Sequence, residues 1–73
     1  MSKNAKVHTE LKLLRANIRR QRCDIKMTQE KMAELTDLNI RTIQKIEAGE
    51  INILVTTLRR IHQALGCPWD RLL

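Results

Sequence analysis

The stretch MTQEKMAELTDLNIRTIQKIEAGE, residues 27–50, contains two helical patterns separated by a few polar residues. In the first pattern, Met32 and Leu35 lie among charged residues. In the second, Ile43 and Ile46 are three residues apart, a spacing that places both side chains on one face of a helix. The other face of this second helix would carry hydrogen-bonding side chains: Arg41, Thr42, Gln44 and Lys45. Two short helices in tandem are therefore predicted, the second with a polar outer face.

Residues that favour helix ends delimit these two helices. Thr28 and Asn39 are predicted N-caps, and Gly49 stands where a left-handed residue ends a helix. These signals predict helices over residues 29–35 and 40–48. Three further helices are expected, one from a Thr9 cap to about residue 24, one over residues 55–65, and a short one over residues 68–73.

No segment shows the alternating pattern of a β-strand, so the sequence predicts an all-α fold, a compact five-helix bundle with one core. Residues 1–8 are expected to form a flexible basic arm, and residues 9–73 a single domain. The side chains predicted to face inward are Leu14, Ile18, Ile25, Met32, Ala33, Leu38, Ile43, Ile46, Leu58, Ile61, Leu65, Trp69 and Leu72.

The net charge of +6 is unevenly distributed along the 73 residues. Residues 1–26 hold eight basic and two acidic side chains, whereas residues 27–73 are balanced. The N-terminal excess fits either a surface that faces a polyanion or a solvated helix face that keeps the protein in solution. With one Trp and no Phe or Tyr, the chain has almost no platform for stacking single-stranded bases. A nucleic-acid partner would therefore be a duplex.

Other function classes find little support in the sequence. Cys23 and Cys67, with His8 and His62, lack the short spacings of a metal site, so no metal, cofactor or small-molecule ligand is expected. No nucleophile, acid–base pair or phosphate loop is evident, and we expect the protein not to be an enzyme. No signal peptide or membrane span is evident either, which predicts a cytoplasmic protein without membrane contact.

Two short helices joined by a tight turn form a helix-turn-helix, whose second helix can lie in the major groove of DNA. Arginine can bridge guanine O6 and N7, glutamine can bridge adenine N6 and N7, and an aliphatic tip can contact a thymine methyl group. The predicted base-reading residues are Ile40, Arg41, Gln44 and Lys45. Those predicted to contact phosphates near the second helix are Thr28, Asn39, Arg19 and Arg20.

The stretch NIRRQRCDIKMTQEKMAELTDLNIRTIQKIEAGE, with TTLRRIHQALGC after it, resembles the Xre and lambda/434 Cro-repressor-like helix-turn-helix domains. The resemblance spans roughly Leu14 to Leu73. It implies that Gln29 contacts a phosphate and braces the recognition helix, and that Arg22 and Glu47 form an internal ion pair.

Glycine positions of this family are occupied by other residues at two points of this chain. Relatives often carry glycine where this chain has Lys26, before the residue that leads into "TQ", and Asp37 replaces glycine in the turn between the two helices. Aspartate tolerates the left-handed conformation better than most residues, and lysine does so less well.

The resemblance and the tandem helices together indicate a sequence-specific, double-stranded DNA-binding transcriptional regulator of the small repressor type. The alternative is a protein-interaction module, such as an antitoxin that also binds DNA to regulate its own synthesis. A homodimer that reads a pseudo-palindromic operator is expected, because two recognition helices related by a two-fold axis read two half-sites. The predicted interface residues are Ile51, Ile53, Val55, Trp69 and Leu73.

Overall fold

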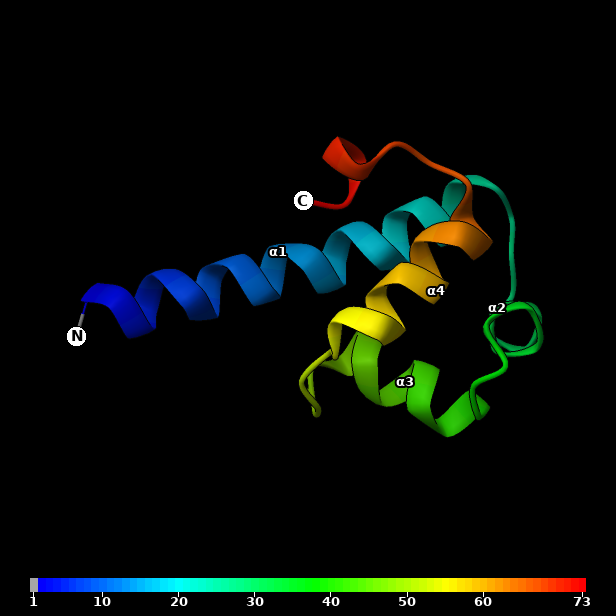
Figure 1. The fold of residues 1–73 in the computed structure, drawn as a ribbon, viewed down its shortest axis with the longest axis horizontal. Helices are drawn as coiled ribbons and strands as arrows, with labels where there is room; N and C mark the ends of the chain where they lie inside the picture. Colours follow the sequence, from blue (N-terminus) through cyan, green and yellow to red (C-terminus); the bar gives the residue numbers. More distant parts are fainter. Residues whose placement is uncertain (1) are drawn as a thin grey trace.

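Four α-helices and a closing 3₁₀ turn make up the part of the chain that the computed structural model describes, the backbone of residues 2–73 and the side chains of residues 10–73. The elements, shown in Figure 1, are α1 (Ser2–Asp24), α2 (Gln29–Thr36), α3 (Ile40–Ala48), α4 (Val55–Leu65) and η1 (Trp69–Arg71). Between residues 2 and 73 no strand is present. The all-α prediction is confirmed, but the α-helices number four and not five.

The fifth predicted helix is a single 3₁₀ turn. The N–H of Arg71 donates to the carbonyl of Pro68 at 3.0 Å, and the N–H of Leu72 donates to that of Trp69 at 2.9 Å. Only three residues are helical. So short a segment gains too few hydrogen bonds to offset the entropy cost of starting an α-helix, so the tighter turn forms instead.

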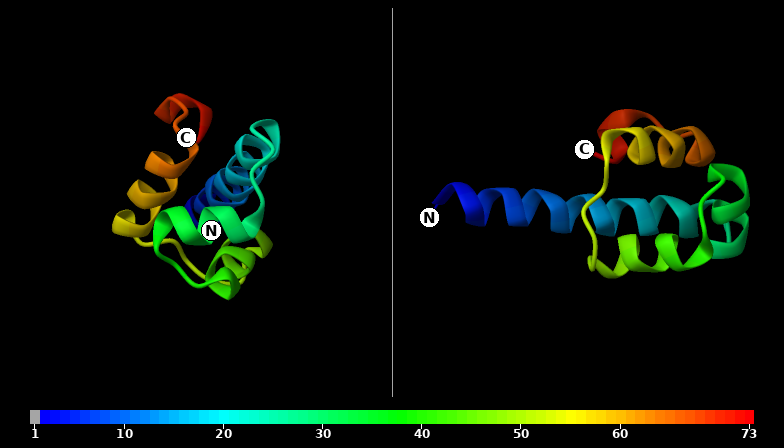
Figure 2. Two further views of the ribbon diagram at one scale, coloured as in Figure 1. Left: turned by 90° about the vertical axis from the view of Figure 1, so that its right-hand side faces the viewer. Right: turned by 60° about the horizontal axis from the view of Figure 1, so that its bottom comes forward.

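The first helix is longer than the sequence predicted. The backbone of α1 is helical from Ser2, so the expected start at Thr9 is wrong, and residues such as Ala5 and Lys6 favour its continuation. The side chains of the predicted arm, residues 1–8, lie outside the part of the chain that is described. The N-terminal half of α1 projects beyond the other helices (Figure 1 and the right view of Figure 2).

Side-chain caps begin the two central helices where the sequence placed them. The N–H of Lys31 donates to Oγ1 of Thr28 at 3.0 Å, and the N–H of Arg41 donates to Oδ1 of Asn39 at 2.8 Å. Each bond satisfies one of the N–H groups that a helix leaves unpaired at its first turn.

Two residues other than glycine adopt the left-handed conformation. Lys26, with φ 56°, ends the turn after α1, and Asp37, with φ 57°, lies between α2 and α3. The N–H of Asp37 donates to the carbonyl of Glu34 at 3.3 Å, and that of Leu38 donates to Ala33 at 3.0 Å. These bonds turn the chain sharply enough for α3 to follow α2 within three residues.

One hydrophobic core lies between the four α-helices. Its buried members are Leu14, Ile18, Met32, Ala33, Ile43, Ile46, Ile61, Leu65 and Leu72. Leu38 and Leu58 are partly buried and pack against them. The sequence missed Thr36, which is buried because its hydroxyl donates to the carbonyl of Met32 at 2.7 Å and so needs no water.

Two predicted core residues are exposed. Ile25 is 49% exposed because α1 ends at Asp24, which places Ile25 in the turn and off the inward face of the helix. Trp69 is 40% exposed although its ring is stacked on the His62 ring, with the ring centroids 3.8 Å apart.

Candidate nucleic-acid interface

The helix α3 is anchored on one face and open on the other. Ile43 and Ile46 are each only 1% exposed, and α3 packs against α1 and α2. On the opposite face, Arg41, Gln44 and Lys45 are exposed. These three predicted base-reading residues therefore project from a helix that the core holds from behind.

The fourth predicted base-reading residue, Ile40, differs from the other three. It is half-buried and packs against the core at the start of α3. Its side chain is thus partly committed to holding the helix, and only its outer portion is available to a ligand.

Arg22 and Glu47 connect α1 to α3 through a bidentate ion pair. Nε of Arg22 lies 2.7 Å from Oε2 of Glu47, and Nη2 lies 3.0 Å from Oε1. The remaining Nη1 donates to the carbonyl of Met27 at 2.8 Å. The two side chains are 12% and 5% exposed, so the pair is largely removed from water. Its parallel hydrogen bonds fix the angle between α1 and α3 as well as their separation.

The ion pair with Glu47 affects the pKa of the Arg22 guanidinium. Its hydrogen bond to Glu47 raises the pKa of the guanidinium above its ordinary value, against the opposing effect of burial. A guanidinium whose pKa is higher in the folded state than in the unfolded state stabilises the fold at every pH below its unfolded pKa. This contribution is lost only as the pH rises through the folded-state pKa. The Arg22 charge therefore contributes fully at neutral pH.

Gln29 extends the ion pair to α2 and to the exposed face of α3. Its Nε2 donates to Oε1 of Glu47 at 3.2 Å, and its Oε1 accepts a longer bond from Nε2 of Gln44 at 3.4 Å. The exposed side chain of Gln44 is thus within reach of a residue at the start of α2. The resemblance implies a bracing role and a phosphate contact for Gln29, and both roles stay predictions.

The other predicted phosphate contacts divide into two groups. The side-chain oxygens of Thr28 and Asn39 are occupied by their helix caps, although both residues are exposed. Arg19 and Arg20 are exposed on α1, and Arg20 is hydrogen-bonded to Asn17 through its Nη2.

One basic residue near α3 was not predicted as a site residue. Nη1 of Arg15 donates to the carbonyl of Ala48 at 3.2 Å, at the end of α3, and its guanidinium lies over Gly49. The spacing of Arg15 from Lys12 and Arg19, three and four residues, places all three on adjacent positions of one helix face. That spacing was visible in the sequence and could have identified Arg15.

The predicted interface residues form no single buried cluster. Ile51 is 39% exposed, Val55 74% and Leu73 75%, whereas Ile53 packs partly against the core. The 51–55 linker and the C-terminus both lie at the end of the body from which α1 projects (Figure 1 and Figure 2).

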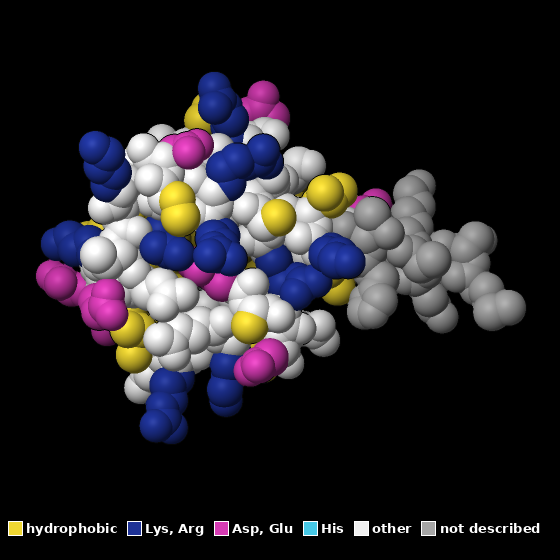
Figure 3. Space-filling view, turned by 180° about the vertical axis from the view of Figure 1, so that it is seen from behind, with side chains coloured by type: hydrophobic (Ala, Val, Ile, Leu, Met, Phe, Trp, Pro, Cys, Tyr) yellow, Lys and Arg dark blue, Asp and Glu magenta, His cyan; other side chains and the backbone are white. Residues whose placement is uncertain are grey.

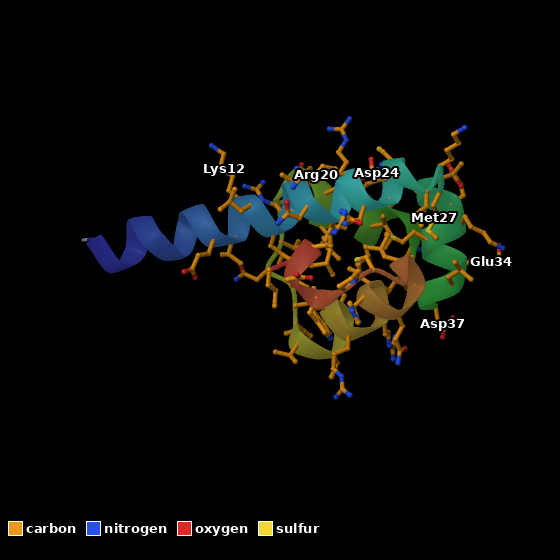
Figure 4. The ribbon with its side chains drawn as sticks, turned by 90° about the horizontal axis from the view of Figure 1, so that it is seen from above. Lys12, Arg20, Asp24, Met27, Glu34 and Asp37 are labelled. Carbon is orange, nitrogen blue, oxygen red and sulfur yellow. The ribbon has the colours of Figure 1, made fainter. Side chains whose placement is uncertain are left out.

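Basic side chains form a band across the middle of one face of the molecule (Figure 3). The band lies at the same height in Figure 3 as α1 does in Figure 1, which is above α3. Lys12 belongs to this helix and points away from α4 and the C-terminal turn (Figure 4). A positive surface of this kind attracts a polyanion.

This combination, a short helix with an exposed polar face that follows a capped helix after a tight turn, is the arrangement of a helix-turn-helix. In a comparison with protein families, residues 18–72 match the helix-turn-helix family of the Xre and lambda-repressor-like type. The match covers well over half of the chain, which therefore belongs to this family. Neither the comparison with curated proteins nor that with solved structures gave a match.

Among the described residues, no helix has the length and apolar character that crossing a membrane requires.

Removing Glu47 should destabilise the fold more than removing an exposed acidic residue. We expect Glu47→Ala to lower the free energy of unfolding by about 2–4 kcal/mol, because Arg22 would keep a largely buried charge without its partner. In a double-mutant cycle with Arg22→Ala, the two losses should sum to more than the loss in the double variant. Urea denaturation measures all three.

Glu34→Ala is the matched control, since Glu34 pairs with Lys31 at 3.6 Å on the surface. Its cost should stay below about 0.5 kcal/mol. Equal losses for Glu34→Ala and Glu47→Ala, or simple additivity in the cycle, would show that the Arg22–Glu47 pair has no structural role.

Proposed function

We propose that this protein is a sequence-specific transcriptional regulator of the small repressor type, which inserts α3 into the major groove of double-stranded DNA. The observation that carries the proposal is the two-sided character of α3. Ile43 and Ile46 are buried behind the helix, while Arg41, Gln44 and Lys45 are exposed in front of it. Such a helix can approach base edges without any rearrangement of the core.

Each exposed side chain suits a different feature of a base pair. Arg41 can donate two hydrogen bonds to the O6 and N7 atoms of guanine, and Lys45 can donate to the same acceptors. Gln44 suits adenine, and its bond to Gln29 limits the directions in which its amide can point. The outer part of Ile40 suits a thymine methyl group.

The start of α2 completes the proposed contact. Thr28 caps this helix, whose first N–H groups and positive dipole end favour a phosphate. Gln29 lies at the same point and is hydrogen-bonded to Glu47. A phosphate held here would set how deeply α3 enters the groove. Regulation would follow from occupancy, because a bound domain excludes other proteins from the same stretch of DNA in the cytoplasm.

Selection of bound sites from a random duplex library tests this function. We expect the protein to enrich a short motif, and Arg41→Ala or Lys45→Ala to relax the preference at particular base pairs, each at a cost of about 1–3 kcal/mol at that position. Arg71→Ala, which removes one charge from η1, serves as the control and should leave the motif unchanged.

Uniform weakening on every sequence by the α3 variants, with no change in the motif, would contradict base reading by α3. If no motif were enriched but a protein partner bound tightly, the protein-interaction alternative would be favoured over the repressor.

We also propose that the protein acts as a homodimer on a pseudo-palindromic operator. Exposed apolar side chains lie near the point where α1 leaves the body: Leu13 is 58% exposed, Leu54 69% and Val55 74%. Leu73, at the C-terminus, lies beside Leu13 in a shared hollow. Association of two copies would remove such residues from water.

Sedimentation equilibrium measures this association. The native protein should sediment as a dimer at tens of micromolar, and Val55→Asp with Leu73→Asp should sediment as a monomer, because a buried carboxylate without a partner is strongly unfavourable. Leu35→Asp places the same charge on α2, where Leu35 is 50% exposed, and should remain dimeric. A native monomer at high concentration would refute the dimer.

A further inference from the structure

Four basic side chains of α1 line an open groove beside α3. They are Lys12, Arg15, Arg19 and Arg20, and Arg20 is also hydrogen-bonded to Asn17. Glu47 of α3 lines the groove as well. The hollow has a volume of about 410 Å³, and Ala16 contributes only a methyl group to its floor. We call this feature the basic groove.

The charge of the basic groove is not neutralised by the rest of the described structure. Glu47 is the only carboxylate at its margin, and it is engaged by Arg22 at 2.7 Å and by Gln29 at 3.2 Å. Among the described side chains, neither salt bridge involves Lys12, Arg15 or Arg19. The sequence from residue 1 to residue 9 contains no acidic residue that could supply another partner.

The basic groove is joined directly to the proposed recognition helix. Arg15 donates to the carbonyl of Ala48, the last residue of α3, and thereby holds the wall of the groove against the end of that helix. Its other guanidinium nitrogens remain able to donate. A duplex that receives α3 in its major groove has a sugar-phosphate backbone on each side of the helix. A basic surface that adjoins the end of α3 would therefore face one of these backbones.

We propose that the basic groove binds the phosphates of the DNA strand that borders the C-terminal end of α3. Lys12 and Arg19 contact successive phosphates, and Arg15 holds the groove in register with α3. This inference rests on the proposed function and adds a second, sequence-independent contact to it. The groove fixes the position of the domain along the backbone, whereas the exposed face of α3 reads the bases.

The salt dependence of DNA binding tests this proposal. Lys12→Ala combined with Arg19→Ala should reduce the slope of log K against log salt by about 1.8, since each lost phosphate contact releases about 0.9 fewer counterions. The affinity should fall on the order of fifty-fold at 0.1 M salt, equally for the selected duplex and for an unrelated one. Arg19→Lys in place of Arg19→Ala should restore part of the slope.

Arg59→Ala with Arg60→Ala is the matched control. It removes the same two charges from the exposed side of α4, outside the basic groove, and should leave the slope nearly unchanged. Circular dichroism melting curves check that both double variants remain folded.

The possible outcomes separate this inference from the proposed function. An unchanged slope for the Lys12 and Arg19 variant, while the native protein still selects a motif, would overturn the groove and leave the function standing. An equal loss of slope in the Arg59 and Arg60 control would also overturn the groove, because it would indicate an effect of net charge alone. An effect of the Lys12 and Arg19 variant on dimerisation, without an effect on DNA binding, would overturn it too. If the native protein bound no duplex, both proposals would fail.

Discussion

The angle at which α1 holds α3 is the constraint on which the rest of this structure depends. Arg22 and Glu47 meet in two parallel hydrogen bonds, and Gln29 of α2 joins the same carboxylate. A largely buried ion pair contributes little net stability compared with well-packed apolar side chains, because both charges lose their hydration. Its directional bonds nevertheless fix three helices relative to one another, and a recognition helix has to be held at one angle to fit a groove.

The small size of the core makes such constraints valuable. Among residues 10–73, nine hydrophobic side chains are buried, close to the minimum that a domain of this size needs. Lys26 and Asp37 adopt the left-handed conformation, which costs a residue other than glycine roughly 1–2 kcal/mol. The fold tolerates this cost because the turns at Lys26 and Asp37 place α2 across the end of α1 and bring α3 directly after α2.

Periodicity and caps were enough to predict the central helices and the two faces of α3, because the burial of Ile43 and Ile46 follows from local spacing. The ends of the chain were harder to predict. The start of α1 depends on many weak helix propensities and not on one cap at Thr9. The 3₁₀ turn is set by the bonds from Arg71 to Pro68 and from Leu72 to Trp69, which no single residue type indicates. The burial of Thr36 and the position of Arg15 depend on tertiary contacts, namely a backbone carbonyl at 2.7 Å and the end of α3.

The central claim is that the exposed face of α3, together with the start of α2, meets DNA while the core behind it stays as it is. Backbone amide chemical shifts, followed by NMR during titration with a selected duplex, test this most directly. The account predicts the largest changes at residues 28–29 and 40–45, with small changes at Ile61 and Leu65 in the core. Changes concentrated on α4 and the C-terminal turn, with α3 unaffected, would contradict it.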